Sequence, residues 1–402
     1  MAFIVQKFGG SSVADAERIK RVAGIIADTY IEGNDVVAVL SAQGDTTDDL
    51  IEKAHELNPN PSKREMDMLM AAGEQISISL LAMAIDTLGF PAISLLGWQA
   101  GFETNSAYSS ARIKRVRPER IRAELDKKRI VVVAGFQGLN KYDDVTTLGR
   151  GGSDTSAVAI AAAMHADLCQ IYTDVEGVYT ADPRKVPRAL KLPEITYDEM
   201  LELATSGAQV LNNRSVEMAK KYSVELEVLS SMTSAPGTKV KEVTKMEKML
   251  IKGVAKDDSV ARISVVALPD SPGIAFKVFS RVAKAHIPVD NILQSVGRDG
   301  TKDLAFTVPA RSGEEAVAAL QEFCDMMGAK ELRCETDVAK ISIVGAGMET
   351  HEGVAAGMFE ALSDANINIQ MISSSEIRVS VLVAKADADR AVTAVHNYFF
   401  DK

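Results

Sequence analysis

Near its start the chain reads AFIVQKFGGSS at residues 2–12, where an apolar segment leads into a lysine, two glycines and two serines. Residues 2–6 predict a short strand, and residues 14–30 predict a helix. Glycine lets backbone N–H groups approach an anion closely, and the start of a helix attracts negative charge. The same letters also fit a plain turn that feeds a helix cap. A phosphate site would be built from Lys7, Gly9, Gly10 and Ser11.

A second glycine-rich loop, TTLGRGGSDTS at residues 146–156, favours the phosphate interpretation over the plain turn. It separates a β-branched strand at 130–134 from an alanine-rich helix, just as the first loop separates a strand from a helix. Two such loops in one α/β domain indicate a bound polyphosphate. The amides of Gly151 and Gly152 would add to those of the first loop.

Other phosphate-binding motifs are missing from the sequence. There is no Gly-x-x-x-x-Gly-Lys-Ser/Thr and no Gly-Lys dipeptide, so a P-loop NTPase is excluded. The catalytic loop and the Asp-Phe-Gly of protein kinases are also absent. Phosphates must then be held by Lys7 as a point charge on the transferring phosphoryl group and by loop amides as fixed dipoles. An acceptor carboxylate would already be ionised at neutral pH, which explains why these motifs contain no histidine.

Composition limits the remaining classes of protein. The 402 residues are 47% hydrophobic and 25% charged, enough for a sizeable core and two or three domains. The net charge of −10 argues against nucleic acid as a partner. Three scattered cysteines predict reduced thiols, not a disulfide framework or a zinc site. No window approaches the ~18 apolar residues of a membrane span, so we expect a cytoplasmic protein without a membrane partner.

Strand-like and helix-like segments alternate through the first part of the chain, as in a mostly parallel sheet covered by helices on both faces. Residues 36–40 and 130–134 read as doubly buried strands, and residues 63–88 as a helix. A Pro-Gly-Thr turn at 236–238 precedes a charged stretch. We expect the first domain to span residues 1–245.

An internal repeat of roughly eighty residues follows. RISVV at 262–266 is echoed by KISIV at 340–344, and IPVDNI at 287–292 by INIQMI at 367–372. Each copy predicts strand, helix, strand, strand, helix, which is a ferredoxin-like order. The copies would form domains 246–334 and 335–402, and they could bind ligands or serve dimerisation alone.

Five motifs occur in an order typical of one enzyme family. They are KFGGSS at 7–12, VLSAQGDTTD at 39–48, AGE at 72–74, GRGGSD at 149–154 and YTDVEGVYTADPR at 172–184. On these motifs the chain resembles the monofunctional aspartate kinases of the amino acid kinase family, and its two repeats resemble ACT domains. The resemblance implies an α/β domain with a mostly parallel sheet between helices, followed by two α+β ferredoxin-like ACT domains.

The resemblance also implies the activity: ATP, with Mg²⁺, phosphorylates the side-chain carboxylate of L-aspartate to 4-phospho-L-aspartate, the first step toward lysine, threonine and methionine. No protein ligand is expected for the metal, because phosphate oxygens and water hold it in such sites. The implied catalytic residues are Lys7 and Asp154. The implied nucleotide contacts are Lys7, Gly9, Gly10, Ser11, Gly151, Gly152, Thr173, Asp174, Tyr179 and Arg184.

Aspartate recognition is implied at Ser41, Thr47, Glu74, Arg150 and Ser153. A guanidinium suits a carboxylate and a carboxylate suits an ammonium group, so Arg150 and Glu74 fit the two ends of the amino acid. Judged from the residues alone, Asp154 could instead be a helix cap, and Glu74 could lie on a solvated helix face.

The ACT resemblance implies feedback regulation by lysine, threonine or both, and a homo-oligomer through the repeats. A start at Met246 or Met249 could give a separate regulatory subunit, or these could be ordinary linker methionines. The implied effector site contains Asp270, Gly273, Ile274, Asp290, Asn291 and Gln294.

The sequence departs from the family pattern at a few positions. Asn212 and Asn213 stand where many relatives carry His-Pro, Leu229 where many carry arginine, and Gln43 where methionine is common. We expect none of these to touch the catalytic set. We also expect no fused homoserine dehydrogenase, because too few residues follow the second repeat.

Two other functions stay open. One is an amino acid kinase that acts on glutamate derivatives or carbamate, although the tandem repeat and the loop at 46–48 count against it. The other is an amino-acid-binding regulator without catalysis. Retention of Lys7, Glu74, Arg150 and Asp154 argues against this second alternative.

Overall fold

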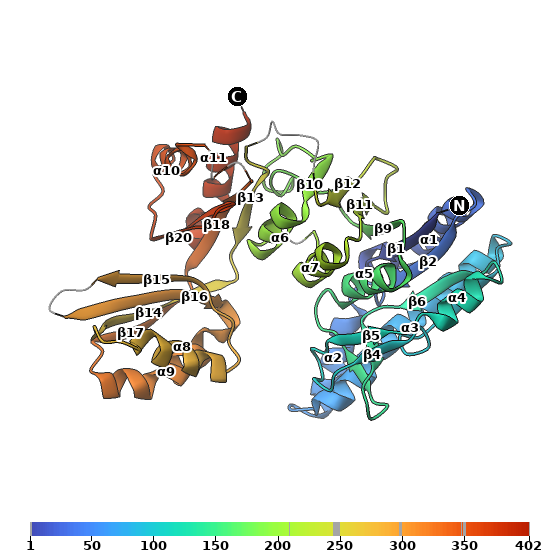
Figure 1. The fold of residues 1–402 in the computed structure, drawn as a ribbon, viewed down its shortest axis with the longest axis horizontal. Helices are drawn as coiled ribbons and strands as arrows, with labels where there is room; N and C mark the ends of the chain where they lie inside the picture. The colour runs from blue at the N-terminus through green and yellow to red at the C-terminus, as the bar shows by residue number, and fades with distance from the viewer. Residues whose placement is uncertain are drawn as a thin grey trace. The chain divides into compact units, whose positions relative to one another are not determined.

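The computed structural model describes residues 2–208, 210–243, 250–296, 300–346, 348 and 351–401, and the chain forms two compact units (Figure 1). The first unit holds residues 1–178, 191–204 and 209–245. The second holds residues 179–190, 205–208 and 246–402. Each unit has its own sheets and its own core.

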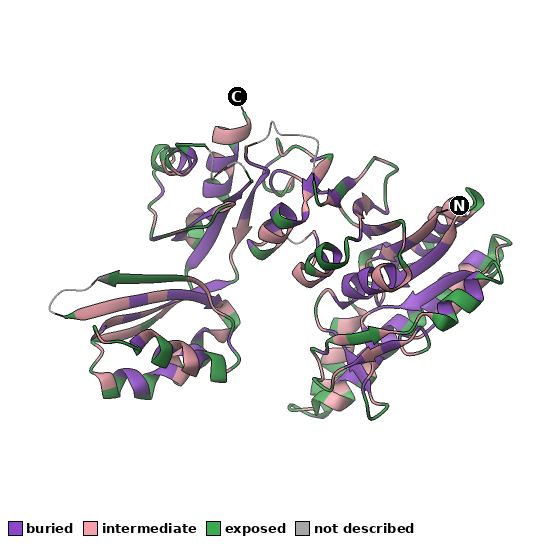
Figure 2. Cartoon of the chain, viewed as in Figure 1, coloured by how far each residue is buried: buried purple, intermediate pink, exposed green. Residues whose placement is uncertain are grey.

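An eight-stranded sheet forms the centre of the first unit, in the order β10-β12-β11-β9-β1-β2-β6-β3. Neighbouring strands run parallel except for β11 and β12, which are antiparallel. Figure 2 shows the central strands as buried, which fits their β-branched runs. The strands are β1 (Phe3–Phe8), β2 (Asp35–Leu40), β3 (Ala92–Leu95), β6 (Ile130–Ala134), β9 (Leu168–Thr173), β10 (Glu194–Thr196), β11 (Leu226–Ser230) and β12 (Thr238–Lys241).

Helices pack against this sheet and complete the predicted α/β fold, which is confirmed. On one face, α1 and α3 bury Val22, Ile26, Leu81 and Ile85 against β1, β2 and β6. Helix α5 contacts β1, β2 and β9. The helices of the unit are α1 (Ala16–Ile31), α2 (Thr46–Leu57), α3 (Lys63–Thr87), α4 (Glu119–Leu125), α5 (Gly152–Met164), α6 (Tyr197–Thr205, which ends in the second unit) and α7 (Asn213–Tyr222).

A small second sheet, β5-β4-β7-β8, flanks the main one. Its strands are β4 (Phe102–Thr104), β5 (Ile113–Val116), β7 (Gln137–Leu139) and β8 (Val145–Thr147). Helix α3 contacts β8 as well as β3. Helix α3 therefore holds β8 in place, and the glycine-rich part of the second loop begins from this fixed strand.

Helix α3 is long and apolar enough, by length and composition, to cross a membrane. The expectation that no window approaches a membrane span is therefore wrong for this helix. In the structure α3 is a core helix, because it packs against α1 and buries Ile78, Leu81 and Ile85. It also buries charged side chains that belong to the site described below.

The second unit contains two four-stranded antiparallel sheets, β15-β16-β14-β17 and β13-β18-β20-β19. Each copy of the repeat has the predicted order of strand, helix, strand, strand, helix. The first copy contains β14 (Val260–Pro269), α8 (Ile274–Lys284), β15 (Asp290–Val296), β16 (Thr301–Pro309) and α9 (Gly313–Met327). The second contains β18 (Val338–Val344), α10 (Val354–Asp364), β19 (Met371–Ser374), β20 (Arg378–Ala384) and α11 (Ala388–Phe400).

The two sheets are interleaved along the chain. Strand β13 (Gly253–Asp257) precedes the first copy in sequence but pairs with β18 of the second. Strand β17 (Glu331–Glu335) completes the first sheet by pairing with β14. The predicted boundary at residue 245 lies outside the described residues, as do Met246 and Met249, and the division into three domains stays a prediction.

Candidate active site

A pocket of about 510 Å³ lies in the first unit, where the loops after β1, β2 and β8 meet the start of α5. Loops at the carboxyl ends of parallel strands are where α/β sheets bind ligands. The pocket brings together both glycine-rich loops and most of the predicted catalytic, substrate and nucleotide residues. Those that line it are Lys7, Gly9, Gly10, Ser41, Thr47, Glu74, Arg150, Gly151, Gly152, Ser153 and Asp154.

Lys7 and Asp154 form an ion pair in this pocket. Lys7 lies near the end of β1, Asp154 lies in the first turn of α5, and 2.6 Å separates Lys7 Nζ from Asp154 Oδ1. Each side chain is only 12% exposed. The cap residue of α5 is Gly151, so Asp154 is not the helix cap that the sequence alone allowed. Its carboxylate instead fixes the direction of the lysine ammonium group.

The glycines of the two loops permit close packing. A Cβ atom on Gly10 would lie 2.6 Å from the carbonyl oxygen of Ala42, and the N–H of Gly44 donates to the Gly10 carbonyl at 3.1 Å. Gly151 has a left-handed φ of 68°, which suits glycine. Helix α5 begins directly after it. The N–H of Gly152 donates to the Gly149 carbonyl at 3.0 Å, and the next N–H groups of the first turn have no partner within the helix, so the helix start can stabilise an anion at the pocket.

Glu74 is buried, with 3% of its surface exposed, although it lines the pocket. Its Oε1 accepts the N–H of Ala42 at 3.2 Å, while Oε2 has no hydrogen-bond partner among the described residues. Burial raises the pKa of Glu74 to about 8, and the backbone N–H groups of Glu74 and Ala42 offset only part of this effect. A solvated helix face is therefore excluded, and Oε2 is a buried carboxylate oxygen without a partner in the described part of the chain.

Asp67 is a site residue that the sequence reasoning missed. It is fully buried on α3, seven residues before Glu74, and so lies on the same helix face. Its carboxylate accepts the N–H of Ser109 at 2.9 Å and both the N–H and the hydroxyl of Thr147, at 2.9 and 2.8 Å. Ser109 and Thr147 line the pocket. The signal was an aspartate two turns before Glu74 in an apolar helix.

Arg150 is exposed in the loop between β8 and α5, and its backbone is held by α7. Asn212 Nδ2 donates to the Arg150 carbonyl at 3.2 Å. This departure from the family pattern therefore contacts a predicted substrate residue, and whether the departures leave the catalytic residues Lys7 and Asp154 untouched stays a prediction. Gln43 instead donates to the Val13 carbonyl at 2.8 Å, and Leu229 packs against the core of the main sheet.

Other predicted nucleotide contacts lie outside the pocket lining. The Ser11 carbonyl accepts Arg18 Nη1 at 2.6 Å, and the Thr173 hydroxyl donates to Asp174 at 3.0 Å. Tyr179 and Arg184 belong to the second unit, and their nucleotide role stays a prediction.

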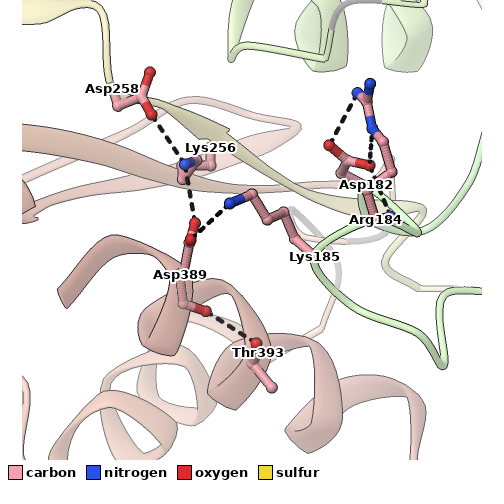
Figure 3. A network of polar contacts seen from close by, with 7 residues as sticks. All are labelled: Asp182, Arg184, Lys185, Lys256, Asp258, Asp389 and Thr393. Carbon is pink, nitrogen blue, oxygen red and sulfur yellow. Dashed lines mark hydrogen bonds and ion pairs between the residues drawn. The ribbon is translucent and has the colours of Figure 1, made fainter. Parts of the chain in front are cut away.

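The segment that carries Arg184 is anchored within the second unit. Arg184 Nε and Nη2 donate to the two Asp182 oxygens at 3.0 and 3.1 Å (Figure 3). The next residue, Lys185, donates to Asp389 on α11 at 2.8 Å, and Lys256 donates to the other Asp389 oxygen at 2.9 Å (Figure 3). Segment 179–190 is thus tied to the repeat through side chains that the sequence motif does not reveal.

The predicted effector residues fall into groups at opposite ends of β16. Pro269, next to Asp270, pairs with Thr301, whereas Asp290 pairs with Thr307. Six residues of strand at ~3.3 Å each place these ends about 20 Å apart. Asp270, Gly273 and Ile274 share the first end, Asp290 and Asn291 the second, and Gln294 lies between them opposite Leu304.

The two ends differ in their contacts. Asp270 forms an ion pair with Lys302 at 2.7 Å, beside the start of α8. Asp290 pairs at 2.8 Å with Lys340, which is only 2% exposed. Burial opposes the charge of Asp290, but Lys340 and Arg378 outweigh it and keep the pKa of this carboxyl below its ordinary value. The second end therefore joins one sheet of the unit to the other.

Comparisons with known proteins agree with the fold. Residues 2–230 match the amino acid kinase family, and residues 341–399 match an ACT domain. An aspartokinase from Mycolicibacterium smegmatis is 51% identical over 405 aligned residues, covering 99% of this chain and 96% of the relative.

Two solved structures of one relative, in different states, are also similar to this chain. E. coli aspartokinase III in complex with aspartate and ADP, in the R-state, has a TM-score of 0.86 at 25% identity, over 99% of this chain and 100% of that one. The same enzyme in complex with lysine and aspartate, in the T-state, has a TM-score of 0.74 at 26% identity, over 99% of each chain. The chain thus belongs to the amino acid kinase family and, within it, to the aspartokinases.

Proposed function

We propose that this chain transfers the γ-phosphoryl group of ATP to the side-chain carboxylate of L-aspartate, which gives 4-phospho-L-aspartate and ADP. The observation that carries the proposal is one pocket whose lining includes an ion-paired lysine, the start of a helix, a buried glutamate and an arginine. Phosphate needs the first two groups, and an amino acid needs the last two.

The chemistry needs no proton transfer. One oxygen of the ionised aspartate carboxylate attacks the γ-phosphorus, and the bond from phosphorus to the bridging oxygen breaks, so its electron pair leaves with ADP. Charge spreads over the phosphoryl oxygens as this happens. Lys7, directed by Asp154, the amide of Gly10 and the start of α5 stabilise that charge by position and electrostatics. The N–H groups of Gly9 and Gly152 already donate to the Tyr172 and Gly149 carbonyls, so they act through the loop shape.

Substrate selection follows from charge complementarity. Arg150 binds a carboxylate of aspartate through its guanidinium group, and the unpaired Glu74 oxygen binds the ammonium group. Ser41, Thr47 and Ser153 line the same pocket and supply short hydroxyl donors. A glutamate derivative or carbamate presents different spacing or lacks the ammonium group, so these alternatives fit less well.

Mg²⁺ fits this site as an ion carried by the triphosphate. Among the described residues no group of three or more His, Cys, Asp and Glu side chains could hold a metal. Asp48 and Asp154 are the aspartates that line the pocket, and they could meet the ion or its water shell. The bound ion would neutralise charge on the phosphate oxygens.

We further propose that residues 1–245 form the catalytic domain and that two ACT domains, 246–334 and 335–402, regulate it. Strand β13 of the first of these ranges joins the sheet of the second. Lysine or threonine would act there through different affinities for two conformations. The complex of E. coli aspartokinase III with lysine supports an amino acid effector. A homo-oligomer in the cytoplasm, where ATP is available, is the expected form.

A coupled ADP-release assay with Mg²⁺, ATP and L-aspartate tests the proposal, with hydroxylamine trapping of the acyl phosphate. We expect aspartate-dependent turnover and a hydroxamate in equal amount. Turnover with a glutamate derivative or carbamate but not with L-aspartate would refute aspartate as the substrate. Absence of any turnover would favour a regulator without catalysis. Added lysine and threonine test the effectors, since a rate unchanged by both would refute that part alone.

A further inference from the structure

The first turn of α7 makes a set of contacts with the loop that carries Arg150. Asn212 caps this helix, because its side-chain oxygen accepts the N–H of Arg214 at 3.0 Å. The amide nitrogen of the same side chain donates to the Arg150 carbonyl at 3.2 Å. One side chain therefore links the helix start to the substrate loop.

The fit between this turn and the loop is tight. A Cβ atom on Gly151 would lie 2.3 Å from Nδ2 and 2.4 Å from Cβ of Asn212. The left-handed φ of 68° at Gly151 turns the chain at this point. Asn212 thus fills the space against the residue that follows Arg150, and it limits the positions that the Arg150 backbone can adopt.

Arg214 holds the loop on the other side of Arg150. Its Nη1 donates to the carbonyl of Leu148 at 3.3 Å and to that of Ala111 at 3.0 Å. Burial, with a contribution from Arg112, lowers the pKa of Arg214, as expected for a guanidinium group that is held inside the protein. The loop is fastened at residue 148 and at residue 150 by two side chains of one helical turn.

We propose that Asn212 is a positioning residue for L-aspartate, which acts by holding the Arg150 backbone so that the guanidinium group meets the substrate carboxylate. This inference rests on the proposed function, in which Arg150 binds that carboxylate. A guanidinium fork binds a carboxylate well only in one orientation. Loss of the Asn212 contact should therefore weaken aspartate binding and leave ATP binding and the chemical step unchanged.

Asn212→Asp is the sharpest test. It keeps the shape and the capping oxygen, and a negative charge at a helix start is favourable, so the fold is retained. It replaces the donor to the Arg150 carbonyl with an acceptor. We expect kcat/KM for aspartate to fall about five- to twentyfold, with kcat and KM for ATP within about twofold, as for lost uniform binding. Asn212→Ser keeps a capping oxygen without adding charge, and it should lower kcat/KM for aspartate at least about threefold.

A double-mutant cycle shows whether Asn212 acts through Arg150. In an Arg150→Ala background, Asn212→Asp should change kcat/KM for aspartate by less than about twofold, because the group that it positions is gone. Lys221→Gln, on the last turn of the same helix, is the matched control and should behave as wild type. Melting temperatures of all variants are measured beside the rates.

The outcomes separate this inference from the proposed function. Wild-type protein without aspartate-dependent turnover would overturn the proposed function. If Arg150→Ala impairs a working enzyme but both Asn212 variants match Lys221→Gln, the positioning role is overturned. It is also overturned if Asn212→Asp lowers kcat/KM for aspartate by as large a factor in the Arg150→Ala background. A variant in which kcat and melting temperature fall while KM for ATP rises would overturn it as well, because this result indicates a general structural role.

Discussion

The buried carboxyl of Glu74 predicts that aspartate binding depends on pH near neutrality. Burial raises the pKa of Glu74 to about 8, so much of the free enzyme carries a protonated, neutral Glu74 at pH 7. The aspartate ammonium group is stabilised by the ionised form only. If Glu74 binds this group as proposed, a proton leaves Glu74 when aspartate binds, and we expect binding to weaken as pH falls below this pKa.

The size of the effect follows from the fraction of ionised Glu74. With a pKa of about 8, that fraction is about 3% at pH 6.5, about 9% at pH 7 and about three-quarters at pH 8.5. The KM for aspartate should then fall about fivefold between pH 7 and pH 8, and about 25-fold between pH 6.5 and pH 8.5. The slope should flatten above pH 8, where most molecules are ionised.

The assay is the initial rate of ADP release over this range of pH, with ATP saturating and aspartate varied. Glu74→Gln is the matched variant, because it keeps the shape and the possible acceptor for the Ala42 N–H but cannot ionise. Its KM for aspartate should exceed that of wild type at pH 8.5, and it should lose most of the dependence on pH.

The same variant gives an independent check on the pKa. A carboxyl whose folded pKa lies above its ordinary value stabilises the fold less as pH rises from that value toward 8, because the folded state then binds more protons than the unfolded state. Glu74→Gln should therefore gain stability relative to wild type between pH 5 and pH 8. A wild-type KM that is flat from pH 6.5 to 8.5, or a Glu74→Gln variant with an unchanged pH profile, would refute the reasoning.

Three further perturbations test other parts of the structure. Lys7→Met should lower kcat about 10²–10³-fold, as expected for loss of a preorganised charge, and retention of more than a tenth of the ADP-release rate would contradict the role of Lys7. Asp67→Ala leaves the buried N–H and hydroxyl of Thr147 without their acceptor, so it should lower the free energy of unfolding by about 3 kcal/mol and raise KM for aspartate; denaturant unfolding beside Asp67→Asn measures this. Asp290→Ala leaves the buried Lys340 without its ion-pair partner and should destabilise the second unit by about 3 kcal/mol, with an unchanged unfolding midpoint as the contrary result.

Local patterns in the sequence were sufficient for the elements and for the phosphate loops. The continuous β-branched runs at 36–40 and 130–134 are strands β2 and β6, and the apolar periodicity at 63–88 is helix α3. Gly10 and Gly151 were recognisable because a close backbone approach and a left-handed turn admit little else. These features depend on neighbours within a few residues, which the sequence displays directly.

Contacts between segments that are far apart in the sequence could not be predicted from local patterns. Asp67 lies in an apolar helix and gave no local sign that it binds the Ser109 and Thr147 backbone, 42 and 80 residues away. The ion pair of Asp290 with Lys340 spans 50 residues and depends on how two sheets meet. Strand β13 likewise pairs with β18 across the whole first copy of the repeat, which no local pattern reveals.

The sequence by itself determined the α/β and tandem ferredoxin-like architecture, the two phosphate loops and the family, because each is written in local periodicity and in short motifs. Only the tertiary structure decided that Glu74 is buried with one free oxygen, that Asp67 supports the pocket wall and that Asn212 holds the Arg150 backbone. Burial and hydrogen bonding arise from packing between segments far apart in the chain. They set the charge state and the orientation of side chains whose identity alone leaves both open.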